Sequence, residues 1–161
     1  MSLVAKLLPA SNVVLGLAVS SKKRLFEQLG YLFEERHGIP KATVFESLFA
    51  RERLGSTALG RGIAIPHGRI KGLKEALGAF ARLDQPLPFE APDGKPVSLV
   101  FAMLVPEQAT DRHLEVLSEL AQMFSDPMLR EALAAAPDAD SLQRLIAAWH
   151  PDAPGQRRAA A

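Results

Sequence analysis

The chain has 161 residues, 48% of them hydrophobic and 23% charged, which is the composition of an ordinary globular domain with a sizeable core. Its net charge of +1 excludes the strongly basic field of a nucleic-acid binder, and the absence of cysteine excludes disulfides, thiolate metal sites and cysteine nucleophiles. No apolar run reaches the roughly 18 residues that span a bilayer, and the N-terminus lacks the order of a signal peptide, so we expect a soluble cytoplasmic protein.

The first third of the chain predicts one strand and three helical segments. Apolar side chains recur at helical spacing in the longest segment, with serines before it and a glycine after it. His37 falls in the last turn of that segment, where positive charge is favourable, and is expected to be structural. The expected elements are one or two helical turns within residues 1–9, a strand at 13–17, a helix from Ser20 or Ser21 to Gly38, and a helix from Pro40 or Lys41 to Arg53.

The next strand is expected to end beside a histidine. Residues 63–65 have the length and β-branched content of a buried strand, and Pro66, which has no N–H for a sheet ladder, is expected to end it. His67 then lies at the edge of the sheet, where α/β proteins bind ligands. Gly68 is expected to leave room for another molecule's backbone, within a loop over residues 68–73.

Possible donors to a phosphoryl group precede this histidine. They are the hydroxyls of Ser56 and Thr57 and the guanidinium of Arg51, which is expected in the last turn of its helix. A nucleophilic imidazole near guanidinium and hydroxyl donors suits a phosphoryl group. By residue type alone, however, a lone histidine is more often structural, an arginine is more often a solvated surface residue, and the glycines match no standard phosphate loop.

The second half of the chain predicts two more strands and three helices. They are expected at residues 77–83 and 97–105 for the strands, and at 111–125, 126–135 and 141–149 for the helices. His113 lies on the same helical stripe as core leucines, close to the end of the 97–105 strand. If that strand is parallel to the 63–65 strand, His67 and His113 meet at one edge of the sheet; otherwise His113 is a packing residue.

Strand and helix patterns alternate, which indicates an α/β fold with helices on both faces of one sheet. The sequence does not decide whether the 13–17 or the 77–83 strand is antiparallel. We expect a single domain over residues 1–150. Residues 151–161 have little to bury and are expected to form a disordered tail.

Two blocks of sequence resemble the fructose/mannitol-type enzyme IIA domain of the bacterial phosphoenolpyruvate-dependent phosphotransferase system. The first block comprises residues 51–52 (RE), 55–60 (GSTALG) and 62–67 (GIAIPH), and the second comprises residues 96–106 (PVSLVFAMLVP) and 113–117 (HLEVL). The blocks have the family's order and about its separation, and the resemblance extends over roughly residues 3–149. It implies the family's fold, a single small mixed β-sheet sandwiched between helices.

The resemblance also implies a mechanism. His67 would accept a phosphoryl group on Nε2 from a phosphohistidine on a small carrier protein of the HPr type or its nitrogen-branch counterpart. The other ring nitrogen would be held by a backbone carbonyl. His113 and Arg51 would hold the phosphoryl oxygens, with Ser56 and Thr57 as weaker hydrogen-bond candidates. The chemistry requires no metal and no organic cofactor, and the sequence leaves open whether Arg53 or Arg69 contacts the phosphoryl group in place of Arg51.

Within the family, the opening of the chain resembles the stand-alone nitrogen-regulatory members, which bind regulatory targets according to their phosphorylation state. Two alternatives remain: a sugar-transport enzyme IIA that passes phosphate to a IIB protein, and a non-catalytic binding module whose histidine is never phosphorylated. A two-histidine metal hydrolase is a remote possibility, because no carboxylate stands at a ligand spacing beside His67 or His113. The regulated target and the oligomeric state are not indicated.

Overall fold

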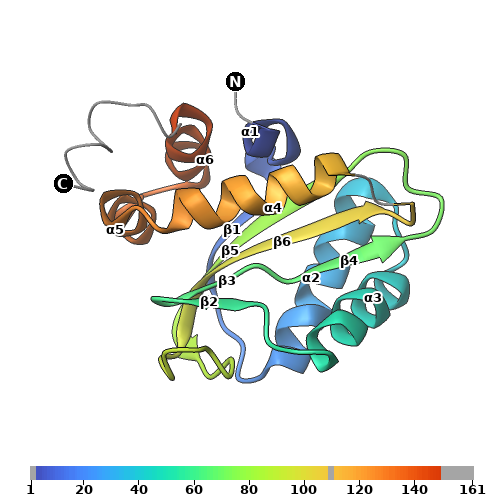
Figure 1. Ribbon diagram of the computed structural model, residues 1–161, viewed down its shortest axis with the longest axis horizontal. Helices are drawn as coiled ribbons and strands as arrows, with labels where there is room; N and C mark the ends of the chain where they lie inside the picture. Colours follow the sequence, from blue (N-terminus) through green and yellow to red (C-terminus); the bar gives the residue numbers. More distant parts are fainter. Residues whose placement is uncertain (1–2, 109–110, 150–161) are drawn as a thin grey trace.

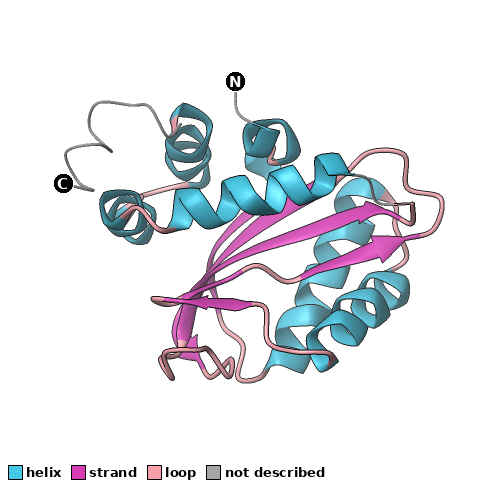
Figure 2. Ribbon diagram, viewed as in Figure 1, coloured by secondary structure: helices cyan, strands magenta, loops and turns pink. Residues whose placement is uncertain are grey.

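The computed structural model describes residues 3–108 and 111–149, in which one mixed β-sheet lies between two layers of helices (Figures 1 and 2). The strand order is β1-β5-β6-β3-β2, and β4 pairs with β6 as well. The predicted α/β fold with a mixed sheet is therefore confirmed. The strands are β1 (Val13–Leu17), β2 (Ala58–Gly60), β3 (Ile63–Ala64), β4 (His67–Ile70), β5 (Leu77–Leu87) and β6 (Val97–Pro106).

The pairing directions answer the question that the sequence left open. Strand β5 is antiparallel to β6, and β1 is parallel to β5. Strands β3 and β4 are both parallel to β6, with Ile63 opposite Leu99 and His67 opposite Met103. The condition under which the two histidine regions meet at one edge of the sheet is therefore fulfilled.

Helices cover both faces of the sheet. Figure 1 shows α1, α4, α5 and α6 on one face and α2 and α3 on the other. Side chains of β6 alternate between the two layers: Phe101 and Met103 pack with the first group, and Val100 and Ala102 with the second. The helices are α1 (Leu3–Leu7), α2 (Lys22–His37), α3 (Lys41–Arg53), α4 (Asp111–Phe124), α5 (Pro127–Ala135) and α6 (Ala139–Ala148), with a 3-10 turn, η1, at Ala10–Asn12.

Local capping signals explain why several helix ends were predicted correctly. The Ser21 hydroxyl accepts a hydrogen bond from the Arg24 amide at the start of α2, and Gly38 ends that helix with a φ of 72°, in the left-handed region that favours glycine. The Asp126 carboxylate caps α5 in the same way. Helix α6, by contrast, begins two residues before the predicted Ser141, because Asp138 is its cap.

The predicted loop at residues 68–73 is wrong in its first part, because residues up to Ile70 belong to β4. Pro66 separates β3 from β4 without ending the pairing with β6: its carbonyl accepts a hydrogen bond from the Met103 amide at 2.9 Å. A proline lacks only the donor, so its acceptor still serves the ladder. His67 therefore lies at the start of a strand rather than beyond the end of one.

The space above Gly68 is filled by the protein itself. An added Cβ at Gly68 would lie 2.2 Å from the Ser47 hydroxyl oxygen and 3.0 Å from the Ser47 backbone carbonyl. The expectation that this glycine admits another molecule's backbone is therefore wrong. Gly68 instead allows α3 to pack directly on β4.

Two other strand predictions were incomplete. Strand β2 was not predicted; it pairs antiparallel with β3 through a turn in which Arg61 and Gly62 have φ of 58° and 82°. Strand β5 extends beyond the predicted residue 83 to Leu87. The expected disordered tail at residues 151–161 lies outside the described residues. None of the described helices is both long and apolar enough to cross a membrane.

Candidate functional site

His67 is held by a hydrogen bond from its own ring to the backbone. Its Nδ1 lies 2.8 Å from the carbonyl oxygen of Ile65, two residues earlier. A carbonyl only accepts, so Nδ1 carries the proton in this contact, and in the neutral ring Nε2 keeps its lone pair. The half-buried imidazole thus presents an unprotonated nitrogen as its nucleophilic atom.

The surroundings of His67 lower its pKa below the ordinary value of 6.5. Burial is the largest cause, because it disfavours the charged ring, and the positive charge of Arg51 acts in the same direction. The contact with the Ile65 carbonyl and the negative charge of Glu52 raise the pKa and oppose this shift. The net effect keeps the imidazole neutral, and hence nucleophilic, at pH 7.

His67 lines a cavity of about 840 Å³ between α3, β4, the end of β6 and α4. His113, from the first turn of α4, lines the same cavity, as do Arg51 and Arg69. The sheet explains why both histidines line one cavity, because β4 and β6 are parallel and α4 follows β6. Other side chains of the lining are the cation Lys71, the apolar Met103, Leu114, Leu117 and Leu54, and the acidic Glu46, Glu107 and Asp111.

The structure separates the three arginine candidates. Arg51 lines the cavity and donates from Nη1 to the Gly55 carbonyl at 2.8 Å, which holds its guanidinium near the loop after α3. Arg69 also lines the cavity and donates from Nη1 to the Glu107 carbonyl at 3.2 Å. The guanidinium of Arg53 lies 5.1 Å from the centre of the Phe49 ring, and Arg53 is not part of the lining.

The hydroxyls of Ser56 and Thr57 are engaged elsewhere, and neither residue lines the cavity. The Ser56 hydroxyl donates to the Phe89 carbonyl and accepts from the Ala58 amide. The Thr57 hydroxyl is buried and donates to Glu52 at 2.6 Å. In this structure both side chains fix the loop between α3 and β2.

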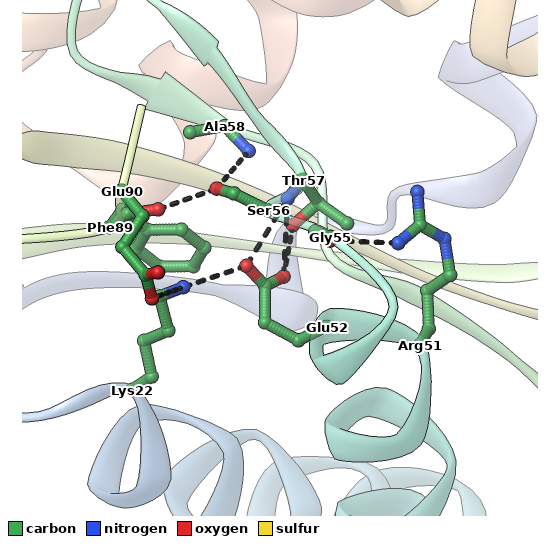
Figure 3. A network of polar contacts seen from close by, with 9 residues as sticks. All are labelled: Lys22, Arg51, Glu52, Gly55, Ser56, Thr57, Ala58, Phe89 and Glu90. Carbon is green, nitrogen blue, oxygen red and sulfur yellow. Dashed lines mark hydrogen bonds and ion pairs between the residues drawn. The ribbon is translucent and has the colours of Figure 1, made fainter. Parts of the chain in front are cut away.

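Sequence reasoning missed Glu52, which is buried although it is charged. Figure 3 shows its carboxylate between Lys22 of α2 and Thr57, while Arg51 points the other way toward Gly55. Lys22 Nζ lies 2.9 Å from one Glu52 oxygen, and the Thr57 amide donates to the same carboxylate. The only signal in the sequence was an acidic residue at a helix end followed by a glycine loop, which is too common to be specific.

His37 has the structural position that the sequence indicated. Its Nε2 lies 2.8 Å from the side-chain amide nitrogen of Asn12, which is fully buried and also donates to the Gly78 carbonyl at 3.0 Å. The pKa of His37 is lowered, first by burial and then by the charge of Arg36. This contact ties the end of α2 to η1, away from the cavity.

Comparison with known proteins places this geometry in a family. Residues 6–149 match the model of the family described as phosphoenolpyruvate-dependent sugar phosphotransferase system, EIIA 2. A nitrogen regulatory protein from Pseudomonas aeruginosa is 46% identical over 127 residues, which cover 78% of this chain and 82% of the relative. One from Bradyrhizobium diazoefficiens is 40% identical over 144 residues, covering 89% and 94%. The crystal structure of the nitrogen regulatory protein IIA-Ntr from Neisseria meningitidis superposes with a TM-score of 0.85 at 54% identity, covering 90% of this chain and 99% of that one.

Proposed function

Because the chain belongs to the EIIA 2 family of the phosphoenolpyruvate-dependent sugar phosphotransferase system, we propose that it accepts a phosphoryl group on Nε2 of His67. The observation that carries this assignment is the 2.8 Å contact between Nδ1 and the Ile65 carbonyl. It leaves Nε2 as the only ring nitrogen able to attack, on a residue that lines a cavity with two arginines and a second histidine.

The proposed step is an in-line displacement at phosphorus. The Nε2 lone pair forms the new N–P bond, and the N–P bond of a donor phosphohistidine breaks with its electron pair returning to the donor's ring nitrogen. No proton has to be removed from the attacking atom, since the neutral tautomer already has its proton on Nδ1. The reaction therefore depends on positioning and charge stabilisation, as phosphoryl transfers in general do.

Arg51 and His113 are assigned to the phosphoryl oxygens. Both line the cavity that contains His67, and both can donate hydrogen bonds to the charge on the equatorial oxygens. Arg69 lines the same cavity and is a second guanidinium for this role. Guanidinium and imidazole donors in the same cavity as a nucleophile are what an anionic group in transfer requires.

The donor is assigned as a small phosphocarrier protein of the HPr type, the partner class that the family implies. Leu54 and Leu114, with 85% and 65% of their surfaces exposed, line the same cavity as Arg51, Arg69 and Lys71. Exposed leucines next to a charged site suit a transient protein interface. The relatives named nitrogen regulatory proteins support assignment to the nitrogen branch, in which the phosphorylation state controls binding to regulatory targets.

The direct test is intact mass after incubation with phosphoenolpyruvate, enzyme I and the small carrier. Wild type should gain one acid-labile phosphoryl group, and His67→Ala should gain none. His113→Ala should still be phosphorylated, about 100-fold to 1,000-fold more slowly, which is the range for losing one donor to a transition state. His37→Ala is the matched control, because His37 lies outside the cavity, and it should behave as wild type.

The outcome separates the alternatives. If wild type gains no mass although the carrier is charged, the proposal is wrong and the non-catalytic binding module replaces it. If His67→Ala is phosphorylated as rapidly as wild type, His67 is not the acceptor. Rapid onward transfer to a IIB protein in the same mixture would favour the sugar branch over the nitrogen branch.

A further inference from the structure

Hydrogen bonds, joined through the backbone of Thr57 and Ile65, link α2 to the reactive imidazole. Lys22 contacts the Glu52 carboxylate at 2.9 Å, and Glu52 accepts from the Thr57 hydroxyl at 2.6 Å and from the Thr57 amide at 3.2 Å. The Thr57 carbonyl then accepts from the Ile65 amide at 3.0 Å, and the Ile65 carbonyl holds His67 Nδ1 at 2.8 Å. The Ile65 carbonyl, which accepts the hydrogen bond from His67, is thus linked through Thr57 to the buried carboxylate of Glu52.

We propose that Glu52, held by Lys22, is a positioning residue that sets the orientation and tautomer of His67 through Thr57 and Ile65. This inference rests on the proposed function, since it assigns a role in the phosphoryl transfer to His67. Glu52 does not line the cavity, so its proposed effect on the ring is transmitted through the backbone rather than by contact with the phosphoryl group.

The short strands next to His67 explain why such support is needed. Strand β2 has three residues and β3 has two, so their ladder contributes few hydrogen bonds. Pro66, between Ile65 and His67, has no N–H to donate. The Ile65 amide donates to the Thr57 carbonyl across the hairpin, so the position of the Ile65 backbone depends on that of Thr57. A reactive group has to be held within about 0.5 Å of its productive position, which two short strands followed by a proline do not ensure alone.

The burial of Glu52 shows that its geometry is specific. The residue is 8% exposed, and a carboxylate is buried at this level only when its oxygens are paired. Both oxygens are used here, by Lys22 and by the amide and hydroxyl of Thr57. Lys22 is itself fixed, because its ammonium lies 4.6 Å from the centre of the Phe89 ring. The carboxylate is therefore restrained from three directions.

Glu52 also acts on His67 through its charge. It raises the pKa of the imidazole, against the larger effect of burial and the positive charge of Arg51. The other charged or titratable side chains that line the cavity are Glu46, Arg69, Lys71, Glu107, Asp111 and His113, and they are unchanged when Glu52 alone is substituted. Loss of the Glu52 charge is therefore expected to lower the pKa of His67.

The test compares four variants of the full chain. Glu52→Gln removes the charge, and Thr57→Val removes the hydroxyl with little change of shape. Thr57→Ser restores the hydroxyl and is the conservative rescue. Glu90→Gln is the matched control, since Glu90 also contacts Lys22, at 3.2 Å, but its side chain is 87% exposed and has no link to Thr57. Each variant is assayed well below its own melting temperature, so that loss of fold does not contribute.

Two measurements distinguish positioning from a purely structural role. The first is the nitrogen-15 chemical shifts of the His67 ring as a function of pH, which report the tautomer and the pKa. The second is the rate of phosphoryl transfer from the charged carrier, with saturation kinetics to separate kcat from KM. A structural role would lower the melting temperature and leave the tautomer, the pKa and kcat of the folded protein unchanged.

We expect Glu52→Gln to lower the pKa of His67, to reduce the fraction with the proton on Nδ1, and to lower kcat by about 10-fold to 100-fold with little change in KM. Thr57→Val should have a smaller effect in the same direction, and Thr57→Ser and Glu90→Gln should match wild type. Wild-type shifts and kcat in both Glu52→Gln and Thr57→Val would overturn the inference, and so would equal losses in Thr57→Ser. If wild type accepts no phosphoryl group, the proposed function fails, and the nitrogen-15 shifts alone still decide whether Glu52 positions His67.

Discussion

Replacing Gly68 by alanine places a methyl group where α3 already lies against β4. The new Cβ would be 2.2 Å from the Ser47 hydroxyl oxygen and 3.0 Å from the backbone carbonyl carbon and oxygen of the same residue. These contacts differ in how they can be relieved. The hydroxyl can rotate away, whereas the backbone can give way only if α3 moves as a unit.

The cost follows from these contacts. Rotating the hydroxyl breaks its 2.7 Å hydrogen bond to the Arg69 carbonyl, worth about 1 kcal/mol. Moving the helix backbone by a few tenths of an ångström is an overpacking cost of about 2 kcal/mol. The lower entropy of an unfolded chain with alanine returns about 0.7 kcal/mol. Gly68→Ala should therefore reduce the free energy of unfolding by about 2 kcal/mol.

Urea unfolding of Gly68→Ala, Ser47→Ala and the double variant forms the assay. In the Ser47→Ala background the hydroxyl is already absent, so the second substitution should cost about 1 kcal/mol less than it does in wild type. The urea dependence of the free energy should stay constant, since the surface exposed on unfolding is unchanged. A fully stable Gly68→Ala, or costs that simply add in the double variant, would refute the close packing of α3 on β4.

Three further predictions concern the cap of α5, the pH dependence of stability, and Leu114 in the cavity lining. Asp126→Ala should cost about 2 kcal/mol in urea unfolding, because it removes the cap of α5 and the 3.1 Å bond from the Trp149 indole; an unchanged midpoint would contradict this. Because the pKa of His67 is lowered in the folded protein, the imidazole of the unfolded chain takes up a proton at higher pH than that of the folded chain. The free energy of unfolding should therefore fall as the pH drops from 6.5 toward the pKa of His67 in the folded protein. The urea midpoint should depend less on pH in His67→Gln than in wild type across this range. The same pH dependence in both proteins would contradict the prediction. Leu114→Ser should raise KM for the carrier about 5-fold and leave stability within about 0.5 kcal/mol of wild type, whereas an unchanged KM would exclude Leu114 from the interface.

The sequence predicts the elements whose signals are local. Ser21 and Gly38 mark both ends of α2, and Asp126 with the following proline marks the start of α5, because caps act within four residues of the position they stabilise. Strand β6 is apolar along its length since it is central and buried on both faces. For these elements the physics that forms them lies within a few neighbours.

Elements that depend on distant partners were missed or misplaced. Strand β2 is three residues long, too short for a periodic pattern, and exists through its pairing with β3. The continuation of pairing from β3 past Pro66 into β4 depends on the Met103 amide, which lies on another strand. The role of Gly68 likewise depends on Ser47, twenty-one positions earlier in the chain. A single sequence contains the residues of such contacts without indicating their pairing.

In the site, too, features with local signals were predicted, and features that depend on distant partners were not. The sequence placed His67 and His113 together only on the condition that the strands before them are parallel, and the structure fulfils this condition. The engagement of the Ser56 and Thr57 hydroxyls within the loop could not be inferred, because it depends on Phe89 and Glu52 as partners. The burial of the Glu52 carboxylate depends in turn on Lys22, thirty positions earlier.

The end of α3 acts on His67 from two sides. Successive residues on a helix point about 100° apart, so Arg51 and Glu52 diverge: Arg51 lines the cavity and Glu52 is buried against Lys22 and Thr57. Their charges have opposite effects on the pKa of His67, and burial tips the balance toward the neutral ring. Both effects fall off with distance from the imidazole, so they require α3 to lie close to β4. The absence of a side chain at Gly68 permits that approach, and in this way a residue with no reactive group sets the electrostatics of its reactive neighbour.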